Sequence, residues 1–470
     1  MGSLTAAQRS VRFRLHPAER RVILFLGDVV AATAALGISI YWWGQIDWLD
    51  FSWEFLFQRI PPWFWLMPLV WLILNVELYD IRRAGRRRET IKGVAIAATI
   101  SLFLYVFVFF LSQRDLPRRG VITFIVFAAL LMTAWRFTYI GVFTAPEFLR
   151  RVVIVGAGRA GSTLAKVVRE MWPPPFYLVG LIDDDPAKRN TTVEGYPVLG
   201  GCETLMTTLE KHRISDVIFA ISGEMSPEMF QALLQAEEEG VEVTTMASMY
   251  EELMGRVPIF LLRSDWILRS FVDQAHANGF YELIKRLLDI VGGLVGVLIL
   301  MMAFPFIALA ITLESGRPVI YTQSRLGKNG REYKIIKFRT MREAFDEEGR
   351  PLPDEQRITR VGRILRKSHL DELPQFINVL RGEMSLVGPR AERSELVNEL
   401  QGKVPFYRAR LLVKPGITGW AQINFGYATT VEDTAVKLEH DLYYIKRRNL
   451  LLDFIILLRT FGTVVGFRGQ

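Results

Sequence analysis

Long apolar stretches constrain this chain of 470 residues more than any other feature. Four of them precede residue 145: Val22 to Trp43, Pro61 to Tyr79, Gly93 to Leu111, and Gly120 to Phe143. A helix of about 20 residues rises about 30 Å, which is the thickness of the hydrocarbon layer of a bilayer. We therefore expect residues 1–145 to form four transmembrane helices.

The cations beside these stretches predict their orientation. Arginine and lysine gather before the first stretch and between the second and the third: Arg9, Arg12, Arg14, Arg20, Arg21, Arg82, Arg83, Arg86, Arg87, Arg88 and Lys92. Both segments are expected to be cytoplasmic, because cytoplasmic loops carry an excess of Lys and Arg. Arg114, Arg118 and Arg119 in the second outer loop oppose this rule. Four spans return the chain to the cytoplasm near Arg150.

The composition limits the kinds of functional site that the chain can form. Cys202 is the only cysteine, which excludes an intramolecular disulfide framework, and the five histidines are scattered without the spacing of a zinc site. The net charge of +8 suits a chain that lies against anionic lipid or handles phosphate. We therefore expect carboxylates and cations to carry any catalysis.

From Arg151 onward, short apolar runs alternate with amphipathic ones, which predicts a Rossmann-like α/β domain over residues 146–255. The motif Gly156-x-Gly158-x-x-Gly161 follows an expected strand and opens an expected helix, as in dinucleotide-binding proteins. Asp183, at the end of the second strand, is placed to accept a hydrogen bond from a ribose hydroxyl. A scaffold that keeps the tight turn for packing and binds no dinucleotide explains the motif equally well.

A fifth apolar stretch, Leu287 to Leu313, follows an expected linker over residues 256–280. Cations flank it on both sides: Lys285, Arg286, Arg317, Arg325 and Lys328. Both ends are therefore expected to be cytoplasmic. Pro305 lies inside the stretch and should break or sharply kink a helix, because it lacks an N–H and clashes with the preceding turn. We expect residues 285–313 to form a re-entrant helix, and the apolar segment from Leu450 to Phe467 to lie on the membrane.

The densest motifs follow this helix, within residues 281–470. They are KFRTM (Lys337 to Met341), RKSHLDELPQ (Arg366 to Gln375), GEMSLVGPR (Gly382 to Arg390) and KPGITGWAQIN (Lys414 to Asn424). In SHLDELPQFINVL, Pro374 is tolerated only in the first turn of a helix, which places Asp371 near the N-cap and Glu372 in the first turn. Both carboxylates would stabilise any such helix, by about 1 kcal/mol for the cap.

The cations near this acidic pair suggest a catalytic role as an alternative to helix capping. Four cations lie in the same motifs: Lys337, Arg339, Arg366 and Arg390. Together they could neutralise a diphosphate, and Asp371 and Glu372 would then need Mg²⁺ to offset their repulsion of that substrate. An ionised carboxylate can also attack phosphorus and form an acyl phosphate.

These ordered motifs resemble those of the bacterial sugar transferases, the monotopic polyprenyl-phosphate phosphoglycosyl transferases. The resemblance covers residues 281–470, and the whole chain is similar to the long form of the family. It implies an α-rich monotopic catalytic domain with a re-entrant helix, in a multi-pass protein of the bacterial inner membrane. The Rossmann-like and catalytic domains would both lie on the cytoplasmic side.

The resemblance also implies roles for single residues. Asp371 falls on the nucleophile of the family, and Glu372 on a neighbour that assists with the metal or the acceptor. Arg366 and Lys337 fall on family cations that bind substrate, and Asp441 in HDLYYIK matches a late acidic residue.

The implied reaction transfers hexose 1-phosphate from a UDP-hexose, with glucose or galactose expected, to undecaprenyl phosphate. It requires Mg²⁺, passes through a covalent aspartyl-phosphosugar, releases UMP, and begins exopolysaccharide or O-antigen synthesis. The implied partners are the two substrates and membrane lipid, with no nucleic acid. The sequence leaves open whether the chain forms a homodimer.

Departures and alternatives accompany this resemblance. The family usually has Ser before the proline of its re-entrant helix, where this chain has Phe304, and Ala391 and Lys414 replace a proline and an arginine. Tyr281-x-x-x-Lys285 has the spacing of the catalytic pair in short-chain dehydrogenases, which suggests a membrane nucleotide-sugar dehydratase. Such an enzyme would need a second glycine-rich turn upstream of that pair, and the sequence has none. A non-catalytic membrane scaffold is the other alternative.

Overall fold

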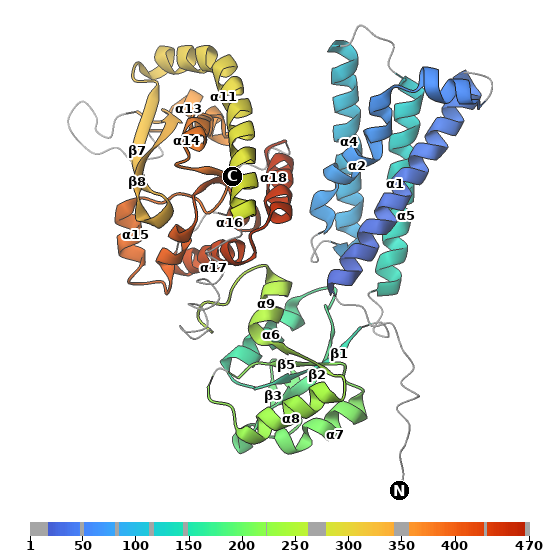
Figure 1. Cartoon of the computed structure of the whole chain (residues 1–470), viewed down its shortest axis with the longest axis vertical. Helices are drawn as coiled ribbons and strands as arrows, with labels where there is room; N and C mark the ends of the chain where they lie inside the picture. The colour runs from blue at the N-terminus through green and yellow to red at the C-terminus, as the bar shows by residue number, and fades with distance from the viewer. Residues whose placement is uncertain are drawn as a thin grey trace. The chain divides into compact units, whose positions relative to one another are not determined.

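The computed structural model describes residues 17–47, 51–79, 84–111, 117–143, 149–221, 223–261, 279–342, 357–426 and 430–465 (Figure 1). They belong to two compact units, Met1–Met249 and Tyr250–Gln470. Several cations used above to predict orientation lie outside the described residues: Arg9, Arg12, Arg14, Arg82, Arg83 and Arg114. Most of the predicted linker, residues 262–278, also lies outside them.

Three of the four predicted N-terminal spans are single long helices. They are α1 (Pro17–Asp47), α4 (Arg87–Leu111) and α5 (Arg118–Phe143). Each contains an apolar segment of 24 to 28 residues, long enough to cross a membrane. Together with α11 in the second unit, they are the four helices of the described residues that reach this length.

The second predicted span is interrupted instead of continuous. It consists of the 3₁₀ turn η2 (Pro62–Leu66), α2 (Met67–Leu74) and the 3₁₀ turn η3 (Val76–Tyr79), preceded by the π-helical turn η1 (Phe55–Arg59). Prolines lie in the first positions of both η2 and α2. The Asn75 side chain donates to the carbonyl of Trp71 at the end of α2. The apolar helical segment Pro62–Leu74 is therefore shorter than a simple span.

A buried ion pair joins α1 to α5. Arg136 Nη2 lies 2.7 Å from Asp28 Oδ2, and both side chains are fully buried. Arg136 also donates to the carbonyl of Leu78. Removing either partner would leave an uncompensated buried charge, which is strongly destabilising. The sequence contains the signal for this pair, because Asp28 and Arg136 are the only charged residues in the first and fourth apolar stretches.

The first unit also contains the expected Rossmann-like domain, built on a parallel sheet in the order β2-β1-β5-β6. Its strands are β1 (Arg151–Val155), β2 (Tyr177–Ile182), β5 (Asp216–Phe219) and β6 (Glu242–Thr245). Its helices are α6 (Arg159–Glu170), α7 (Cys202–His212) and α8 (Pro227–Glu238), with the 3₁₀ turn η5 (Pro186–Lys188) and a small hairpin of β3 (Thr192–Val193) and β4 (Tyr196–Pro197). The prediction of a parallel α/β domain is confirmed. The division between the two units falls within α9 (Met246–Met254).

After the C-terminal part of α9, the next helix of the second unit that the structure describes is the apolar helix α11 (Gly279–Ser315), which runs for 37 residues and contains Pro305. The proline does not end the helix, but Figure 1 shows α11 bent toward its C-terminal end. Both ends contact the same unit. Near the start, Lys285 Nζ lies 2.8 Å from Asp453 Oδ2, and near the end, Glu314 accepts from the backbone N–H groups of residues 360 and 361.

The remaining elements pack around α11 and form a mostly helical domain. They begin with an antiparallel hairpin of β7 (Ile320–Leu326) and β8 (Glu332–Phe338), closed by the 3₁₀ turn η6 (Lys328–Gly330). A second, parallel pair joins β9 (Ser385–Val387) to β10 (Gly416–Thr418). The helices and turns are α13 (Arg360–Lys367), η7 (Leu370–Glu372), α14 (Gln375–Arg381), α15 (Ser394–Leu400), η8 (Tyr407–Leu412), α16 (Trp420–Asn424), α17 (Val431–Arg447) and α18 (Leu450–Val465).

Glycines on α11 allow α14 to approach closely. A Cβ at Gly293 would lie 2.7 Å from the side chain of Leu380, and one at Gly296 would lie 2.2 Å from the ring of Phe376. Both distances are shorter than real Cβ contacts. This close packing fixes α14, and with it the η7 turn that precedes α14, against α11.

Candidate active site

The η7 turn carries the acidic pair that the sequence analysis singled out. Asp371 and Glu372 belong to this 3₁₀ turn, and Pro374 is the N-cap of the separate, seven-residue helix α14. The prediction that both residues lie at the start of one helix is therefore wrong in detail. Among the described residues, the Asp371 side chain accepts no backbone hydrogen bond, so the capping explanation for it is not supported.

Glu372 is held by two cations. Its Oε1 accepts from Lys337 Nζ at 2.7 Å and from Arg390 Nη2 at 2.9 Å, whereas its Oε2 has no partner within the described part of the chain. Burial opposes the charged form, but Arg390 and Lys337 outweigh burial and lower the pKa of Glu372 to about 2. Glu372 is therefore ionised at neutral pH.

Asp371 has the opposite environment. Asp371 is only 8% exposed, and its carboxyl group forms no hydrogen bond or ion pair among the described residues. Burial and then the charge of Glu372 raise its pKa, while Lys337, Arg366 and His369 oppose this increase. The structure thus places a carboxyl group without a bonded partner inside a cationic surrounding.

The other predicted cations divide into two groups. Arg366, near the end of α13, acts electrostatically on Asp371 and donates through Nε to Thr340 Oγ1 at 3.0 Å. Arg339 is instead bound at the end of α11, where it donates to the carbonyls of Ser315 and Arg317. Carbonyls at a helix C-terminus attract such cations. Arg339 therefore stabilises a helix end and makes no hydrogen bond to the acidic pair.

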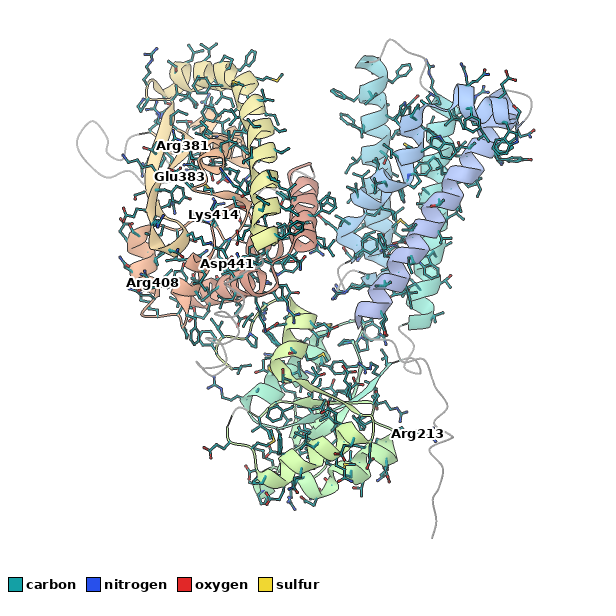
Figure 2. The ribbon with its side chains drawn as sticks, viewed as in Figure 1. Arg213, Arg381, Glu383, Arg408, Lys414 and Asp441 are labelled. Atoms are coloured by element: carbon teal, nitrogen blue, oxygen red, sulfur yellow. The ribbon has the colours of Figure 1, made fainter. Side chains whose placement is uncertain are left out.

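Asp441 lies on α17 (Figure 2) and reaches the acidic pair only indirectly. Its Oδ2 accepts from Arg410 Nη2 at 2.8 Å, and both side chains are almost fully buried. The same Arg410 nitrogen donates to the backbone carbonyl of Arg390 at 2.9 Å. Asp441 thus supports the backbone of a cation that binds Glu372. Arg410 was not among the predicted site residues, because no motif distinguishes it from the arginines beside it.

The glycine turn of the Rossmann-like domain is largely explained by packing. Gly156 has a φ of +106°, which favours glycine, and a Cβ at Gly161 would lie 1.8 Å from the Gly156 carbonyl oxygen. At Gly158, the N-cap of α6, a Cβ would meet nothing within 4 Å. Two of the three glycines are therefore required by the fold itself.

Asp183 is bonded within its own domain. Its Oδ2 accepts from Ala157 N at 2.7 Å and from Lys188 Nζ at 3.0 Å, and its Oδ1 accepts from Asp185 N at 3.0 Å. Although burial opposes it, these donors lower the pKa of Asp183. A carboxylate offers about four acceptor positions, so few remain for a ribose hydroxyl.

Tyr281 and Lys285, whose spacing suggested a dehydrogenase, both bind Asp453. Tyr281 Oη donates to Asp453 Oδ2 at 2.9 Å, and Lys285 Nζ donates to the same oxygen. Lys285 also donates to Tyr444 Oη at 3.1 Å. These bonds join the start of α11 to α17 and α18.

Comparisons with known proteins give two family matches. Residues 280–467 match the family described as "Bacterial sugar transferase", and residues 75–247 match one described as "CoA-binding domain".

Three curated relatives are similar to parts of the chain. The UDP-N-acetylgalactosamine-undecaprenyl-phosphate N-acetylgalactosaminephosphotransferase of Aeromonas hydrophila is 40% identical over 217 residues, 46% of this chain and 50% of that protein. The UDP-glucose:undecaprenyl-phosphate glucose-1-phosphate transferase of Xanthomonas campestris pv. campestris is 32% identical over 287 residues, 58% of this chain and 57% of that protein. The chain thus spans about half the length of these two relatives. The uncharacterized sugar transferase EpsL of Bacillus subtilis is 39% identical over 190 residues, which are 40% of this chain and 90% of that protein.

Proposed function

The chain belongs to the bacterial sugar transferase family, and on this premise we propose that it transfers a sugar 1-phosphate from a UDP-sugar to undecaprenyl phosphate. The family matches confirm the resemblance that the motifs suggested. The names of the Aeromonas and Xanthomonas relatives support both the donor and the acceptor of this proposal. The product would be the first lipid-linked intermediate of exopolysaccharide or O-antigen synthesis.

The observation that carries the proposal is the environment of Asp371. Its carboxyl group is buried and without a bonded partner, yet it lies near Lys337 and Arg366, which favour its charged form. A carboxylate that no hydrogen bond stabilises is available for attack. Glu372, by contrast, is already bound to Lys337 and Arg390 and is less suited to that role.

The proposed reaction has two steps. An Asp371 oxygen attacks the phosphorus that carries the sugar, the bond from that phosphorus to the bridging oxygen of the diphosphate breaks, and UMP leaves. An oxygen of undecaprenyl phosphate then attacks the same phosphorus, and the bond to Asp371 breaks. Asp371 is regenerated, and the products are undecaprenyl-diphosphate-sugar and UMP.

The cations around the turn would stabilise the charge of the diphosphate. Lys337 and Arg390 are fixed by Glu372 on one side, and Arg390 is fixed through its backbone by Arg410 on the other. Cations placed before the substrate arrives need no rearrangement when negative charge moves onto the leaving group. Arg366, on the Asp371 side, would assist in the same way.

The donor atoms of the turn also fit Mg²⁺. This ion is usually bound by one or two carboxylates together with substrate phosphates. Asp371 and the Oε2 atom of Glu372 offer oxygen atoms that are not engaged by any described residue. Mg²⁺ held there would supply neutralisation of the diphosphate charge.

We also propose that α11 is re-entrant and that the catalytic unit lies on the cytoplasmic side of a bacterial inner membrane. A straight helix of 37 residues would be about 55 Å long and would separate its ends across a bilayer. Contacts of both ends with one unit, together with the bend of α11, support re-entry.

Cysteine accessibility in intact cells would test the proposed topology. In a Cys202→Ser background, cysteines placed at Gly279 and at Arg317 should both resist an impermeant reagent added from the periplasm. Labelling at position 317 alone would contradict re-entry.

For the glycine turn, we propose that packing is its main role, with a dinucleotide ligand as the alternative. The bonds of Asp183 within the domain support packing. The length of EpsL supports the view that catalysis does not need a dinucleotide in the Rossmann-like domain. A match of 190 residues of this chain covers 90% of that sugar transferase.

UMP release tests the proposed function. Purified full-length protein, Mg²⁺ and undecaprenyl phosphate should release UMP with at least one of UDP-glucose, UDP-galactose and UDP-N-acetylgalactosamine. A nucleotide-sugar dehydratase would consume the sugar without releasing UMP, and a scaffold would leave every donor intact. Either result with the whole panel would contradict the proposal.

A further inference from the structure

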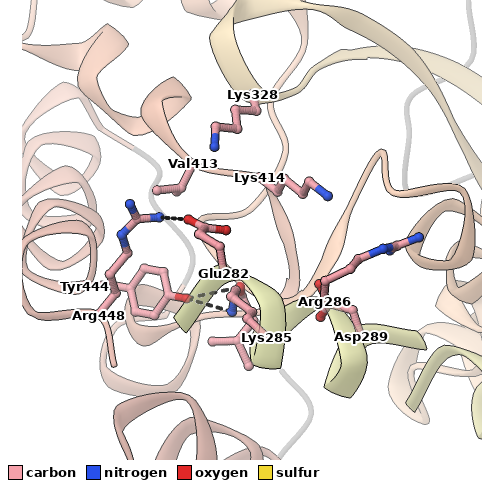
Figure 3. Close-up of a pocket in the computed structure, with 10 residues that line it drawn as sticks. Glu282, Lys285, Arg286, Asp289, Lys328, Val413, Lys414, Tyr444 and Arg448 are labelled. Atoms are coloured by element: carbon pink, nitrogen blue, oxygen red, sulfur yellow. Dashed lines mark hydrogen bonds and ion pairs between the residues drawn. The ribbon is translucent and has the colours of Figure 1, made fainter. Parts of the chain in front are cut away.

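A small cavity lies where α11 begins, outside the residues assigned to catalysis. Its volume is about 90 Å³, well below the roughly 300 Å³ of a pocket for a drug-sized ligand, but enough for a group such as phosphate. Figure 3 shows Lys328 and Lys414 on one side of this pocket and residues of α11, including Arg286 and Asp289, on the other.

The charges that line this pocket do not balance. Five cations and two carboxylates face it: Lys285, Arg286, Lys328, Lys414, Arg448, Glu282 and Asp289. Arg448 is paired with Glu282 at 2.9 Å, and Lys285 is paired with Asp453 at 2.8 Å. Three cations therefore share one remaining carboxylate.

That remaining carboxylate is itself engaged by neutral donors. One oxygen of Asp289 accepts from Ser385 Oγ and from Leu386 N, each at 2.9 Å. Arg286 binds the backbone carbonyls of Val379 and Leu380 at the end of α14, so its position has a structural explanation.

Lys328 and Lys414 lack such an explanation. Both side chains are partly buried, and within the described residues neither forms a hydrogen bond or an ion pair. Lys414 Nζ and Arg286 Nη2 lie 3.6 and 3.5 Å from one point, the position that a Cβ on Gly382 would occupy. Burial and then the charge of Arg286 lower the pKa of Lys414. A bound anion would relieve this repulsion.

The pocket is separate from the acidic pair. Arg286 contacts the C-terminal end of α14, whereas Asp371 and Glu372 precede the N-terminal end of that seven-residue helix. The length of α14 alone amounts to about 10 Å.

The surroundings of the pocket suit the surface of a membrane. Leu283 and Leu287 of α11 and Leu451 and Phe454 of α18 are all more than half exposed. Asp453 bonds α18 to the start of α11 through Lys285, which lines the pocket, so these exposed apolar side chains belong to two helices that meet beside it. Such a combination fits the boundary between phosphate headgroups and acyl chains.

We propose that this pocket binds a phosphate group, which Lys328 and Lys414 hold against Arg286. The group comes either from the headgroup of an anionic membrane lipid or from a soluble phosphate compound. The proposal assigns a role to Lys414, the first residue of KPGITGWAQIN. None of the residues of this motif takes part in the proposed reaction.

Thermal melting of the full-length protein tests the proposal and distinguishes the two sources. One arm compares nanodiscs of phosphatidylcholine with nanodiscs that also contain phosphatidylglycerol. The other compares inorganic phosphate with chloride at equal ionic strength, in phosphatidylcholine nanodiscs. The variants are Lys414→Gln and Lys328→Gln, with Lys403→Gln as a control, because Lys403 is exposed and paired with Glu399 on α15.

One of the two probes should raise the melting temperature of the wild type. Lys414→Gln and Lys328→Gln should each weaken the response by about tenfold or more in probe concentration, as expected for loss of a charged hydrogen bond. Lys403→Gln should behave as the wild type. A response to phosphatidylglycerol alone identifies a lipid headgroup, and a response to inorganic phosphate identifies a soluble source.

The proposal is overturned if neither probe stabilises the wild type, or if both pocket variants respond as Lys403→Gln does. Binding of phosphate at Lys337 and Arg390 would not depend on Lys414, so the variants separate the two sites. Because the readout requires no sugar transfer, its result is independent of the proposed function.

Discussion

Asp183 and Asp371 are both candidate site carboxylates in the sequence, but the structure places their side chains in opposite environments. Asp183 was expected at the end of a strand, placed to accept from a ribose hydroxyl, and Asp371 was expected near the start of a helix, among cations able to neutralise a diphosphate. Asp183 accepts three hydrogen bonds from its own domain, and its pKa is lowered. Asp371 accepts none among the described residues, and its pKa is raised. A carboxylate satisfied by its fold stabilises that fold, whereas an unsatisfied one is retained at a cost and is the better candidate for chemistry.

The largest expected effect comes from Asp371→Asn. The substitution keeps the shape of the side chain but removes the attacking charge, so UMP release should fall by about a thousandfold or more. The melting temperature should stay the same or rise, because a buried charge without a partner is removed. A combined assay of UMP release and thermal melting checks both results. A variant that stays active would end the contrast with Asp183.

Glu372→Gln, at the neighbouring position, should lower stability, whereas Asp371→Asn should leave it unchanged or raise it. Lys337 and Arg390 would lose their shared carboxylate, and the free energy of unfolding at pH 7 should fall by about 3 kcal/mol. Denaturant unfolding of the wild type, Asp371→Asn and Glu372→Gln in one detergent measures the difference. Equal stability of the two variants would show that the two carboxylates are not distinguished by their partners.

Glu372 also predicts a dependence of stability on pH. Its pKa is about 2 in the folded protein, below the ordinary value of 4.5, so its stabilising effect is complete above about pH 4.5. It should be lost progressively as the pH falls from about 4.5 to 2. Unfolding measured over this range should therefore show a shallower pH dependence in Glu372→Gln than in the wild type. Identical curves would contradict the assigned ion pairs.

The glycine turn offers a smaller, paired test. Gly161→Ala places a Cβ against the Gly156 carbonyl and should destabilise the Rossmann-like domain by about 1–3 kcal/mol. Gly158→Ala meets open space and should change stability by less than about 0.5 kcal/mol. Melting with and without NAD, NADP or coenzyme A would sharpen the comparison. A ligand-induced shift that Gly158→Ala abolishes would show that this turn binds a ligand and is not only packed.

Asp183→Asn should have a smaller effect than Asp371→Asn, Glu372→Gln or Gly161→Ala. It weakens bonds to Ala157 N and Lys188 Nζ, and a loss of about 1 kcal/mol in the stability of the Rossmann-like domain is expected. UMP release at saturating substrate should stay within about twofold of the wild type. A fall comparable to that of Asp371→Asn would mean that the two carboxylates share one function.

Local patterns predicted the elements of this chain better than they predicted its contacts. Alternation of apolar runs was enough for the parallel sheet from Arg151 to Thr245, because β1, β2 and β5 are short apolar runs that are largely buried, and the partly exposed β6 follows the same alternation. The second apolar stretch was expected to be continuous, since hydropathy does not register the interruptions at Pro68 and Asn75.

Long-range pairs account for what the sequence could not provide. Arg339 and Arg390 look alike in the motifs, yet one binds the end of α11 and the other binds Glu372, according to where distant segments fold back. Arg410 was missed because its partners Asp441 and Glu392 lie 31 and 18 residues away. Such networks depend on tertiary packing, which no local spacing encodes.

The most direct test of the central claim is to trap the intermediate. Full-length protein is mixed with Mg²⁺ and an active UDP-sugar in the absence of undecaprenyl phosphate, and is then analysed by mass spectrometry. The account predicts one phosphosugar per chain, attached to Asp371, together with an equal amount of UMP released in a single burst. Adding undecaprenyl phosphate should remove the adduct. An adduct on another residue, or lipid-dependent UMP release without any burst or adduct, would contradict the assignment of Asp371 as the nucleophile.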